Sequence, residues 1–313
     1  YVRELEERCA QYSNMDEGIA VSSGTAALVV AIASLDLPKG SEVILPSFTI
    51  ISSVLAVLNA GLRPVLVDAD PETWCMDVTQ IEEKITSNTK AIMVVHIYGH
   101  PVNMGPVHEL AKTRDLLIIE DAAEAHGAEF EGARCGGLSD ISILSFYANK
   151  LVAIGEGGMV LTKSSRYAER ARSLRNLCFN PEKRFLHTEL GYNYRLSNVQ
   201  AAIGVAQLKK LDFFVERKRE VAFRYQAGLK ALPLQLPVEK SWAKNIYWMY
   251  AITLNEDLPI GAEDFIAGLK KKGIGARPFF VGLHEQPALR KMGLFEGEVY
   301  PVTHGITRRG VYL

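Results

Sequence analysis

Lys150 stands just beyond an apolar, strand-like run, in the stretch SFYANKLVAIGEGGMV that begins at Ser145. A lysine in a dry pocket loses proton affinity and becomes a nucleophilic amine. Ser145 offers a further donor to a phosphate. The glycines after the lysine permit close approach of the backbone, and they are Gly155, Gly157 and Gly158. The alternative is a solvated loop lysine followed by a tight hairpin.

Acidic residues end another aliphatic run, in the stretch IIEDAAEAHGA. Glu120 and Asp121 close the run, and Glu124 and His126 follow. A carboxylate at a strand end can hold a cationic ring nitrogen, bind a metal or cap the next turn. No HxH or HxxxE pattern supports a metal, so no metal is expected. For His126 the pattern favours a packing residue over a catalytic one.

The stretch VSSGTAAL places Ser22, Ser23, Gly24 and Thr25 directly before an alanine-rich helix. Free backbone N–H groups and a hydroxyl at a helix N-terminus suit a phosphate, which the helix dipole also favours. The alternative is an ordinary Ser/Thr cap without a ligand.

Short apolar runs that alternate with helical patterns would position these groups. The runs are SEVILP (41–46), RPVLVD (63–68), AIMVVHIYG (91–99), DLLIIED (115–121), DISILSF (140–146) and GGMVLT (157–162). Continuously apolar strands separated by helices predict an α/β fold with a mostly parallel sheet that helices cover on both faces. Ligands of such sheets bind outside the carboxyl ends of the strands, where Asp121, Ser145 and Lys150 are expected.

The second half of the chain has a different pattern. Long amphipathic helices are predicted over SSRYAERARSLRN and over the run from SNVQAA to GLKAL, with the irregular stretch CFNPEKRFLHTELGYNYRL between them. Farther on, IYWMYAITL reads as a strand and EDFIAGLKKKGIGARP as a helix that glycine ends. We therefore expect a large domain over 1–208 and a smaller α+β domain over 209–313.

Composition narrows the class of protein. The chain has 313 residues, 48% of them hydrophobic, and its net charge of -1 gives no reason to expect nucleic acid or an anionic membrane as partner. The longest apolar stretch, AALVVAIASL, is too short to span a bilayer. No export signal is recognisable, and the four scattered cysteines are typical of a reducing compartment, so we expect a cytoplasmic protein.

Taken together, the motifs resemble the DegT/DnrJ/EryC1/StrS family of sugar aminotransferases, which are fold-type I enzymes that use pyridoxal 5'-phosphate (PLP). The matching stretches are SSGTAAL, PSFT, EDAAEAHGA, SFYANK with GEGGMV, GYNYRLSNVQAA, and RPFF followed by HEQP. The resemblance runs from about residue 18 to the end. Within the family, EDAAEAHGA and CFNPEKRFLHTELGYNYR look most like the GDP-perosamine synthases.

The resemblance implies an aspartate aminotransferase-like fold and a set of site residues. Lys150 would bond covalently to PLP and later move the proton, and Asp121 would keep the pyridine nitrogen protonated. The residues implied to bind the cofactor are Gly24, Thr25, Ala26, Asp121, Glu124, Ser145, Lys150 and Asn193. Asn193 would reach the phosphate from a second subunit, so a homodimer with shared active sites is expected. Candidates for substrate contact are His126, Arg277, His284 and Glu285; for the last three the alternative is a capped loop at the domain interface.

The implied reaction moves an amino group from L-glutamate to PLP and then to a nucleotide-linked 4-keto-6-deoxysugar, as in the biosynthesis of surface polysaccharides such as O-antigen. Other nucleotide-linked ketosugars, or a PLP-binding regulatory protein without turnover, are the alternatives. Relatives with histidine in place of the lysine act as dehydratases, so Lys150 favours aminotransfer.

Two positions depart from the family pattern. Many members carry glutamine where this chain has Glu124, so we expect Glu124 to be protonated or turned towards a substrate group. An aromatic residue that stacks on the PLP ring often follows PSFT, where this chain has Ile50; Ile50 can pack on the ring without π overlap, and His126 or another side chain would share the stacking surface.

Overall fold

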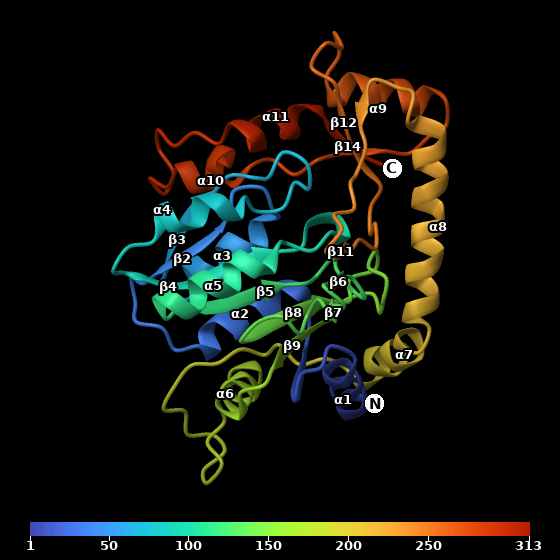
Figure 1. Ribbon diagram of the computed structural model, residues 1–313. Helices are drawn as coiled ribbons and strands as arrows, with labels where there is room; N and C mark the ends of the chain where they lie inside the picture. The colour runs from blue at the N-terminus through green and yellow to red at the C-terminus, as the bar shows by residue number, and fades with distance from the viewer.

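A seven-stranded sheet forms the centre of the protein, whose computed structural model describes residues 1–313 (Figure 1). In spatial order the strands are β1 (Glu17–Val21), β9 (Gly158–Thr162), β8 (Ile141–Ser145), β5 (Leu117–Asp121), β4 (Thr89–Val95), β2 (Glu42–Pro46) and β3 (Arg63–Val67). Strand β9 runs antiparallel to both of its neighbours, and every other neighbouring pair is parallel. The predicted, mostly parallel sheet is confirmed. Strand β1, which the sequence analysis did not identify, adds an edge.

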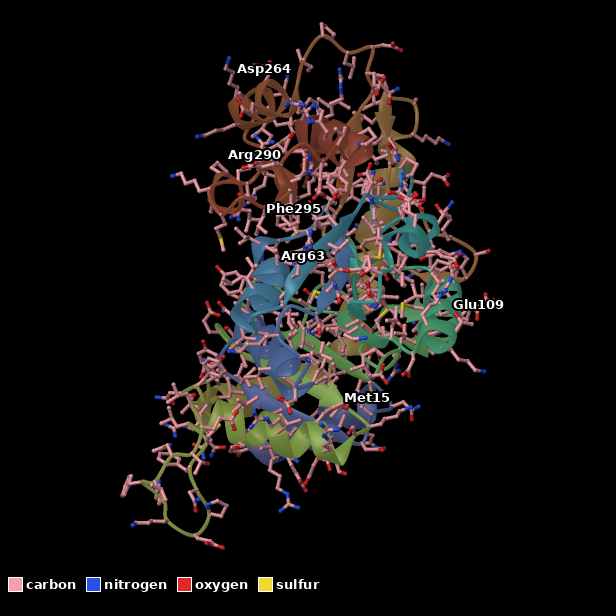
Figure 2. The ribbon with its side chains drawn as sticks, turned by 90° about the vertical axis from the view of Figure 1, so that its left-hand side faces the viewer. Met15, Arg63, Glu109, Asp264, Arg290 and Phe295 are labelled. Carbon is pink, nitrogen blue, oxygen red and sulfur yellow. The ribbon has the colours of Figure 1, made fainter.

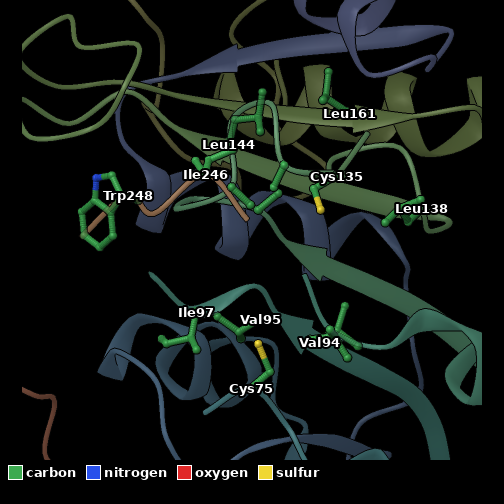
Figure 3. Packing of buried hydrophobic residues seen from close by; sticks show 14 of the residues in the cluster. Cys75, Val94, Val95, Ile97, Cys135, Leu138, Leu144, Leu161, Ile246 and Trp248 are labelled. Carbon is green, nitrogen blue, oxygen red and sulfur yellow. The ribbon is translucent and has the colours of Figure 1, made fainter. Parts of the chain in front are cut away.

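Helices cover both faces of this sheet, because its strands alternate apolar side chains between two cores. One core joins the sheet to α2 (Gly24–Ser34), α3 (Ile51–Asn59) and α6 (Ser165–Arg175). The other joins it to α1 (Val2–Tyr12), α5 (Met104–Arg114), α7 (Asn198–Leu208) and α8 (Leu211–Leu229). Figure 3 shows part of this second core, where Val94, Leu144 and Leu161 come from three strands. Each such side chain contributes about 1.5–3 kcal/mol when fully buried.

The second long helical run is divided at Lys209 and Lys210 into α7 and α8. Helix α8 extends along one side of the molecule towards a second sheet (Figure 1). That sheet is antiparallel, with the order β10 (Leu234–Gln235), β12 (Ala251–Leu254), β14 (Gly310–Tyr312) and β13 (Arg277–Pro278). The helices of this region are α9 (Ala262–Lys271), α10 (Pro287–Arg290) and α11 (Pro301–Arg309).

The predicted domain boundary between residues 208 and 209 falls between α7 and α8, and the division stays a prediction. The core that contains Val94 and Leu144 also takes in Ile246 and Phe279 from the C-terminal region. The two regions therefore share buried surface. The remaining elements are the small sheet of β11 (Ala243–Lys244), β6 (Glu129–Phe130) and β7 (Ala133–Arg134), helix α4 (Ile81–Lys84), and 3₁₀ turns at Val78–Gln80, Ile97–Gly99 and Leu283–Glu285.

The strand predicted over IYWMYAITL is wrong in its first half. Only Ala251–Leu254 is a strand, and Tyr247 has a φ of 49°. The reason is that this segment pairs with a turn far away in the chain. Ile246 N–H donates to the carbonyl of Gly99 in that turn over 3.1 Å. Within the segment itself, Tyr247 N–H donates to Asn245 Oδ1 over 2.8 Å.

The four cysteines are buried and free of disulfides. No helix has both the length and the apolar character needed to cross a bilayer.

Candidate active site

A cavity of about 440 Å³ lies at the carboxyl ends of the central strands, between the large sheet and the C-terminal region. Seven of the residues implied by the sequence line it, and they are Gly24, Thr25, Asp121, Glu124, Ser145, Lys150 and Arg277. Strand β5 ends at Asp121 and β8 ends at Ser145, so two neighbouring strands deliver these groups to one edge. This is the position where parallel sheets bind ligands.

The N-terminus of α2 forms one end of the cavity. Ser23 caps the helix: its Oγ accepts a hydrogen bond from Ala26 N–H over 3.0 Å, and its carbonyl accepts one from Ala27 N–H, also over 3.0 Å. The amides of Gly24 and Thr25 precede Ala27, whose N–H is the first that bonds to a backbone carbonyl of the helix, and they are therefore available to an anion. The cap is therefore confirmed, and the anion site at the two free amides stays a prediction.

Hydroxyl groups surround these amides. Thr25 Oγ1 lies 2.9 Å from Ser52 Oγ. A Cβ at Gly24 would lie only 2.8 Å from Ser145 Oγ, so glycine is required for this close approach. Backbone donors and three hydroxyls in one place fit the phosphate of PLP.

Asp121 is buried, and its carboxylate has few partners. Oδ1 accepts from Ala123 N–H over 3.1 Å, and Oδ2 accepts from Ser53 Oγ over 3.4 Å. Burial raises the pKa of the Asp121 carboxyl above its ordinary value, because removal from water penalises the charged form. A cationic ring nitrogen would relieve that penalty, so Asp121 fits the pyridine nitrogen of PLP.

Lys150 reaches the cavity from the turn after β8, where its N–H donates to the carbonyl of Tyr147 over 2.9 Å. Its side chain is only 10% exposed. Nζ lies 3.5 Å from Glu124 Oε1 and 3.5 Å from the centroid of the Trp248 ring. The amine therefore stands in a largely dry site between a carboxylate and an aromatic face.

Glu124 is turned towards the lysine. Its Oε2 accepts from Tyr98 N–H over 2.8 Å, while Oε1 faces Lys150. Burial raises the pKa of the Glu124 carboxyl, and the nearby lysine acts in the opposite direction. Ile50, the other departure from the family pattern, also lines the cavity and is 45% exposed.

Three candidates for substrate contact do not line the cavity. His126 packs inside the protein, 5.8 Å from the Phe146 ring, and burial lowers its pKa to about 3. Because His126 is buried and does not line the cavity, it does not contribute to the stacking surface expected beside Ile50. His284 is buried next to Tyr300, and Glu285 accepts from His304 over 2.6 Å, so both belong to the packing of the C-terminal region.

Two cofactor candidates lie apart from the cavity wall. Ala26 is buried within the first turn of α2, where its N–H is already bonded to the cap. Asn193 is exposed and forms an isolated bridge with Asn176. It does not line the cavity of its own chain, and its role at the cofactor stays a prediction.

The sequence analysis missed several residues of the site. Trp248, Phe280 and Tyr312 line the cavity from the C-terminal region, and Ser53 donates to Asp121. Trp248 was concealed in the run IYWMYAITL, whose aromatic content suggested a strand. Ser53 follows the PSFT motif within α3 and carried a detectable signal, since a hydroxyl one turn from that motif faces the same edge of the sheet.

The fold and the site define a class: a PLP-dependent aminotransferase of fold type I, with an amine, a buried carboxylate and an anion-binding helix end around one cavity. Bound PLP supplies the electron sink for transfer of an amino group. The sequence profile of the DegT/DnrJ/EryC1/StrS aminotransferase family matches residues 1–313, and the chain belongs to this family.

Individual relatives agree with that assignment. The chain is similar to GDP-perosamine synthase of Escherichia coli O157:H7, with 39% identity over 316 residues that cover 100% of this chain and 84% of the relative. It is similar to UDP-N-acetyl-3-dehydro-alpha-D-glucosamine 3-aminotransferase of Acidithiobacillus ferrooxidans, with 39% identity over 81% of this chain and 68% of the relative. The crystal structure of DesV from S. venezuelae with a ketimine intermediate superposes with a TM-score of 0.92 and 33% identity, covering 100% of this chain and 83% of that one.

Proposed function

We propose that this enzyme transfers an amino group from L-glutamate to a nucleotide-linked 4-keto-6-deoxysugar, in the manner of a GDP-perosamine synthase. The observation that carries the proposal is the approach of Lys150 to Glu124 in the cavity that Asp121 and the N-terminus of α2 also line. The relative from Escherichia coli supports a GDP-linked sugar, because its sequence aligns with the whole of this chain at 39% identity.

In this proposal each side chain has a defined task. Lys150 holds PLP covalently and moves a proton at Nζ, since a side chain released beside the reacting carbon suits a 1,3-proton shift. Asp121 pairs with the ring nitrogen. Glu124 Oε1, 3.5 Å from Nζ, is placed to accept a proton from the ammonium.

Arg277 is proposed to bind the anionic part of the substrates. It lies at the start of β13, an edge strand of the second sheet, and it and Lys150 are the two cationic residues that line the cavity. A guanidinium suits carboxylate and phosphate oxygens alike, which matches both glutamate and a nucleotide diphosphate.

A homodimer with shared active sites is part of the proposal. The irregular segment between α6 and α7 projects from the body as an arm (Figure 2, lower left). Phe185 and Leu190 on this segment are 83% and 90% exposed. Apolar side chains gathered on one projecting segment support contact with another chain. A second copy that packs on the arm would bring Asn193 towards the neighbouring cavity.

We further propose that the enzyme acts in the cytoplasm, in the biosynthesis of O-antigen or a related polysaccharide.

The test of the chemistry is spectroscopic. The purified protein is expected to be yellow, to lose its visible absorbance with borohydride, and to change its spectrum on addition of L-glutamate. Peptide mapping after borohydride is expected to find the label on Lys150. Lys150→Ala should be inactive but folded and should take up no borohydride label, whereas Lys163→Ala, which removes an exposed lysine, should behave as the wild type. A label on another lysine contradicts the assignment.

The test of the substrate is a panel of GDP-, UDP- and dTDP-linked ketosugars with glutamate as donor. Turnover is expected with the GDP-linked 4-ketosugar. The second candidate, a 3-ketosugar linked to UDP, is favoured by the identity to the Acidithiobacillus relative, and preference for that sugar would replace the first proposal. A spectrum that glutamate leaves unchanged would favour a PLP-binding regulatory protein.

A further inference from the structure

Trp248 touches the amine of Lys150, although nothing in the motifs assigns it a role. The side chain is 4% exposed and lines the cavity. Lys150 Nζ lies 3.5 Å from the centroid of its ring, within the range of a cation–π interaction. Figure 3 shows Trp248 at the edge of the core, beside Ile246. The indole therefore provides one wall of the site in which the amine stands.

The indole is fixed relative to the lysine backbone. Trp248 Nε1 donates to the carbonyl of Asn149 over 2.9 Å, and Asn149 directly precedes Lys150. The ring consequently cannot turn away without breaking this partly buried hydrogen bond. The indole is therefore anchored to the backbone next to Lys150 and also contacts the amine of that lysine.

The segment that carries the indole is fixed as well. Lys218 Nζ on α8 donates to the carbonyl of Trp248 over 2.9 Å, and burial lowers the pKa of Lys218. Gly99 lies against the segment, and a Cβ there would be 2.9 Å from Trp248 N. Because Gly99 also has a φ of +99°, glycine is needed for this approach. The C-terminal region is thereby held against the large sheet at the point where the amine is bound.

We propose that Trp248 is a positioning residue that, together with Glu124, holds the Lys150 amine in the place from which it condenses with an aldehyde. The inference rests on the proposed function, in which Lys150 binds PLP. In the condensation the ammonium gives one proton to Glu124 and the amine nitrogen bonds to the aldehyde carbon. The C=O bond is replaced by C=N, and the oxygen leaves as water with the two remaining amine protons.

The test compares variants that have an aromatic or an aliphatic side chain at position 248. PLP is added to full-length protein from which it has been removed, and the rise of visible absorbance gives the rate constant of condensation. Trp248→Leu is expected to lower this rate constant about 10-fold, since the aromatic face that holds the amine in position is lost, and Trp248→Phe only about 3-fold, since a smaller aromatic face remains. Trp242→Phe is the matched control and should leave the rate unchanged, because Trp242 packs on His100 and Phe130 outside the cavity.

Melting temperatures and fluorescence distinguish positioning from a structural role. A merely structural role would lower the melting temperatures of the variants without the graded rate constants. If Trp248→Leu does not fold, Trp248→Phe carries the test through fluorescence: in the wild type PLP is expected to quench an indole that Trp248→Phe lacks, while Trp242→Phe retains the quenching. Equal rate constants for wild type and Trp248→Leu, or equal quenching in Trp248→Phe, would overturn the inference. A borohydride label on another lysine would instead overturn the proposed function.

Discussion

Glu120 and Asp121 are consecutive buried carboxylates at the end of β5, yet their surroundings differ. Successive residues of a strand point to opposite faces of the sheet. The oxygens of Glu120 accept from His96 Nε2 over 2.9 Å, Leu138 N–H over 3.0 Å and Ser139 Oγ over 3.1 Å, and from Gly136 N–H. Asp121 has two hydrogen bonds, the second of them 3.4 Å long.

The end of β5 therefore serves two purposes, one on each face of the sheet. A buried charge is tolerated when donors surround it, and Glu120 therefore ties β5 to the segment after β7. Asp121 faces the cavity and keeps unused acceptor capacity, which a group that binds a ligand needs. Two histidines repeat the contrast: His96 uses both ring nitrogens, whereas neither nitrogen of His126 has a hydrogen-bond partner in the protein.

The largest effect is expected for activity at the cavity-facing carboxylate. Asp121→Asn should lower kcat by about 10²–10⁴-fold, because an amide does not keep the ring nitrogen of PLP cationic. PLP binding, measured by visible absorbance, should persist. A kcat near that of the wild type would show that another group protonates the ring, and the contrast between the two faces would lose its functional meaning.

The second effect is on stability, at the opposite face. Glu120→Ala should lower the free energy of unfolding by about 3–5 kcal/mol, because it leaves His96 and two backbone amides without their buried partner. Urea unfolding measures this change. Glu109→Gln on the exposed side of α5 (Figure 2) is the control and should change stability by less than about 0.5 kcal/mol. Equal losses in both variants would contradict the role of Glu120.

A third effect depends on pH. The folded-state pKa of Asp121 is raised, so its stabilising contribution is present below the ordinary carboxyl pKa and is lost as pH rises through the folded value. In PLP-free protein, Asp121→Asn should therefore be more stable than the wild type at pH 8, and the advantage should shrink as pH falls towards 4. With PLP bound, the wild type should be the more stable of the two proteins. Urea unfolding at several pH values, with and without PLP, would sink this idea if the wild type were the more stable throughout.

The smallest effect is expected at His126. Replacement by leucine removes two unpaired ring nitrogens from a buried site, so His126→Leu should change the free energy of unfolding by no more than about 1 kcal/mol. His96→Leu should cost about 3 kcal/mol, since it strands Glu120 and the amide of Val102. Thermal unfolding of the two variants measures the difference. A larger loss for His126→Leu would mean that its nitrogens have partners in solution.

Much of the fold was predictable because its signals are local. The apolar runs that became β2, β3, β4, β5, β8 and β9 needed no knowledge of their neighbours, and strand ends in a parallel sheet meet at one edge. Positions 121, 145 and 150 were placed at the site for this reason. The strand over IYWMY failed, because its conformation depends on Gly99, which is distant in sequence.

The order of residues along the chain was enough to identify the chemical groups: a lysine, a carboxylate and a capped helix end, each next to a strand or helix that local periodicity predicts. Which of these groups come into contact depends on how the elements pack in three dimensions. This packing buried His126 and His284 in cores and brought Trp248 from the C-terminal region onto Lys150. The physical reason is that side-chain direction follows local backbone geometry, whereas contacts between distant segments depend on how whole elements pack.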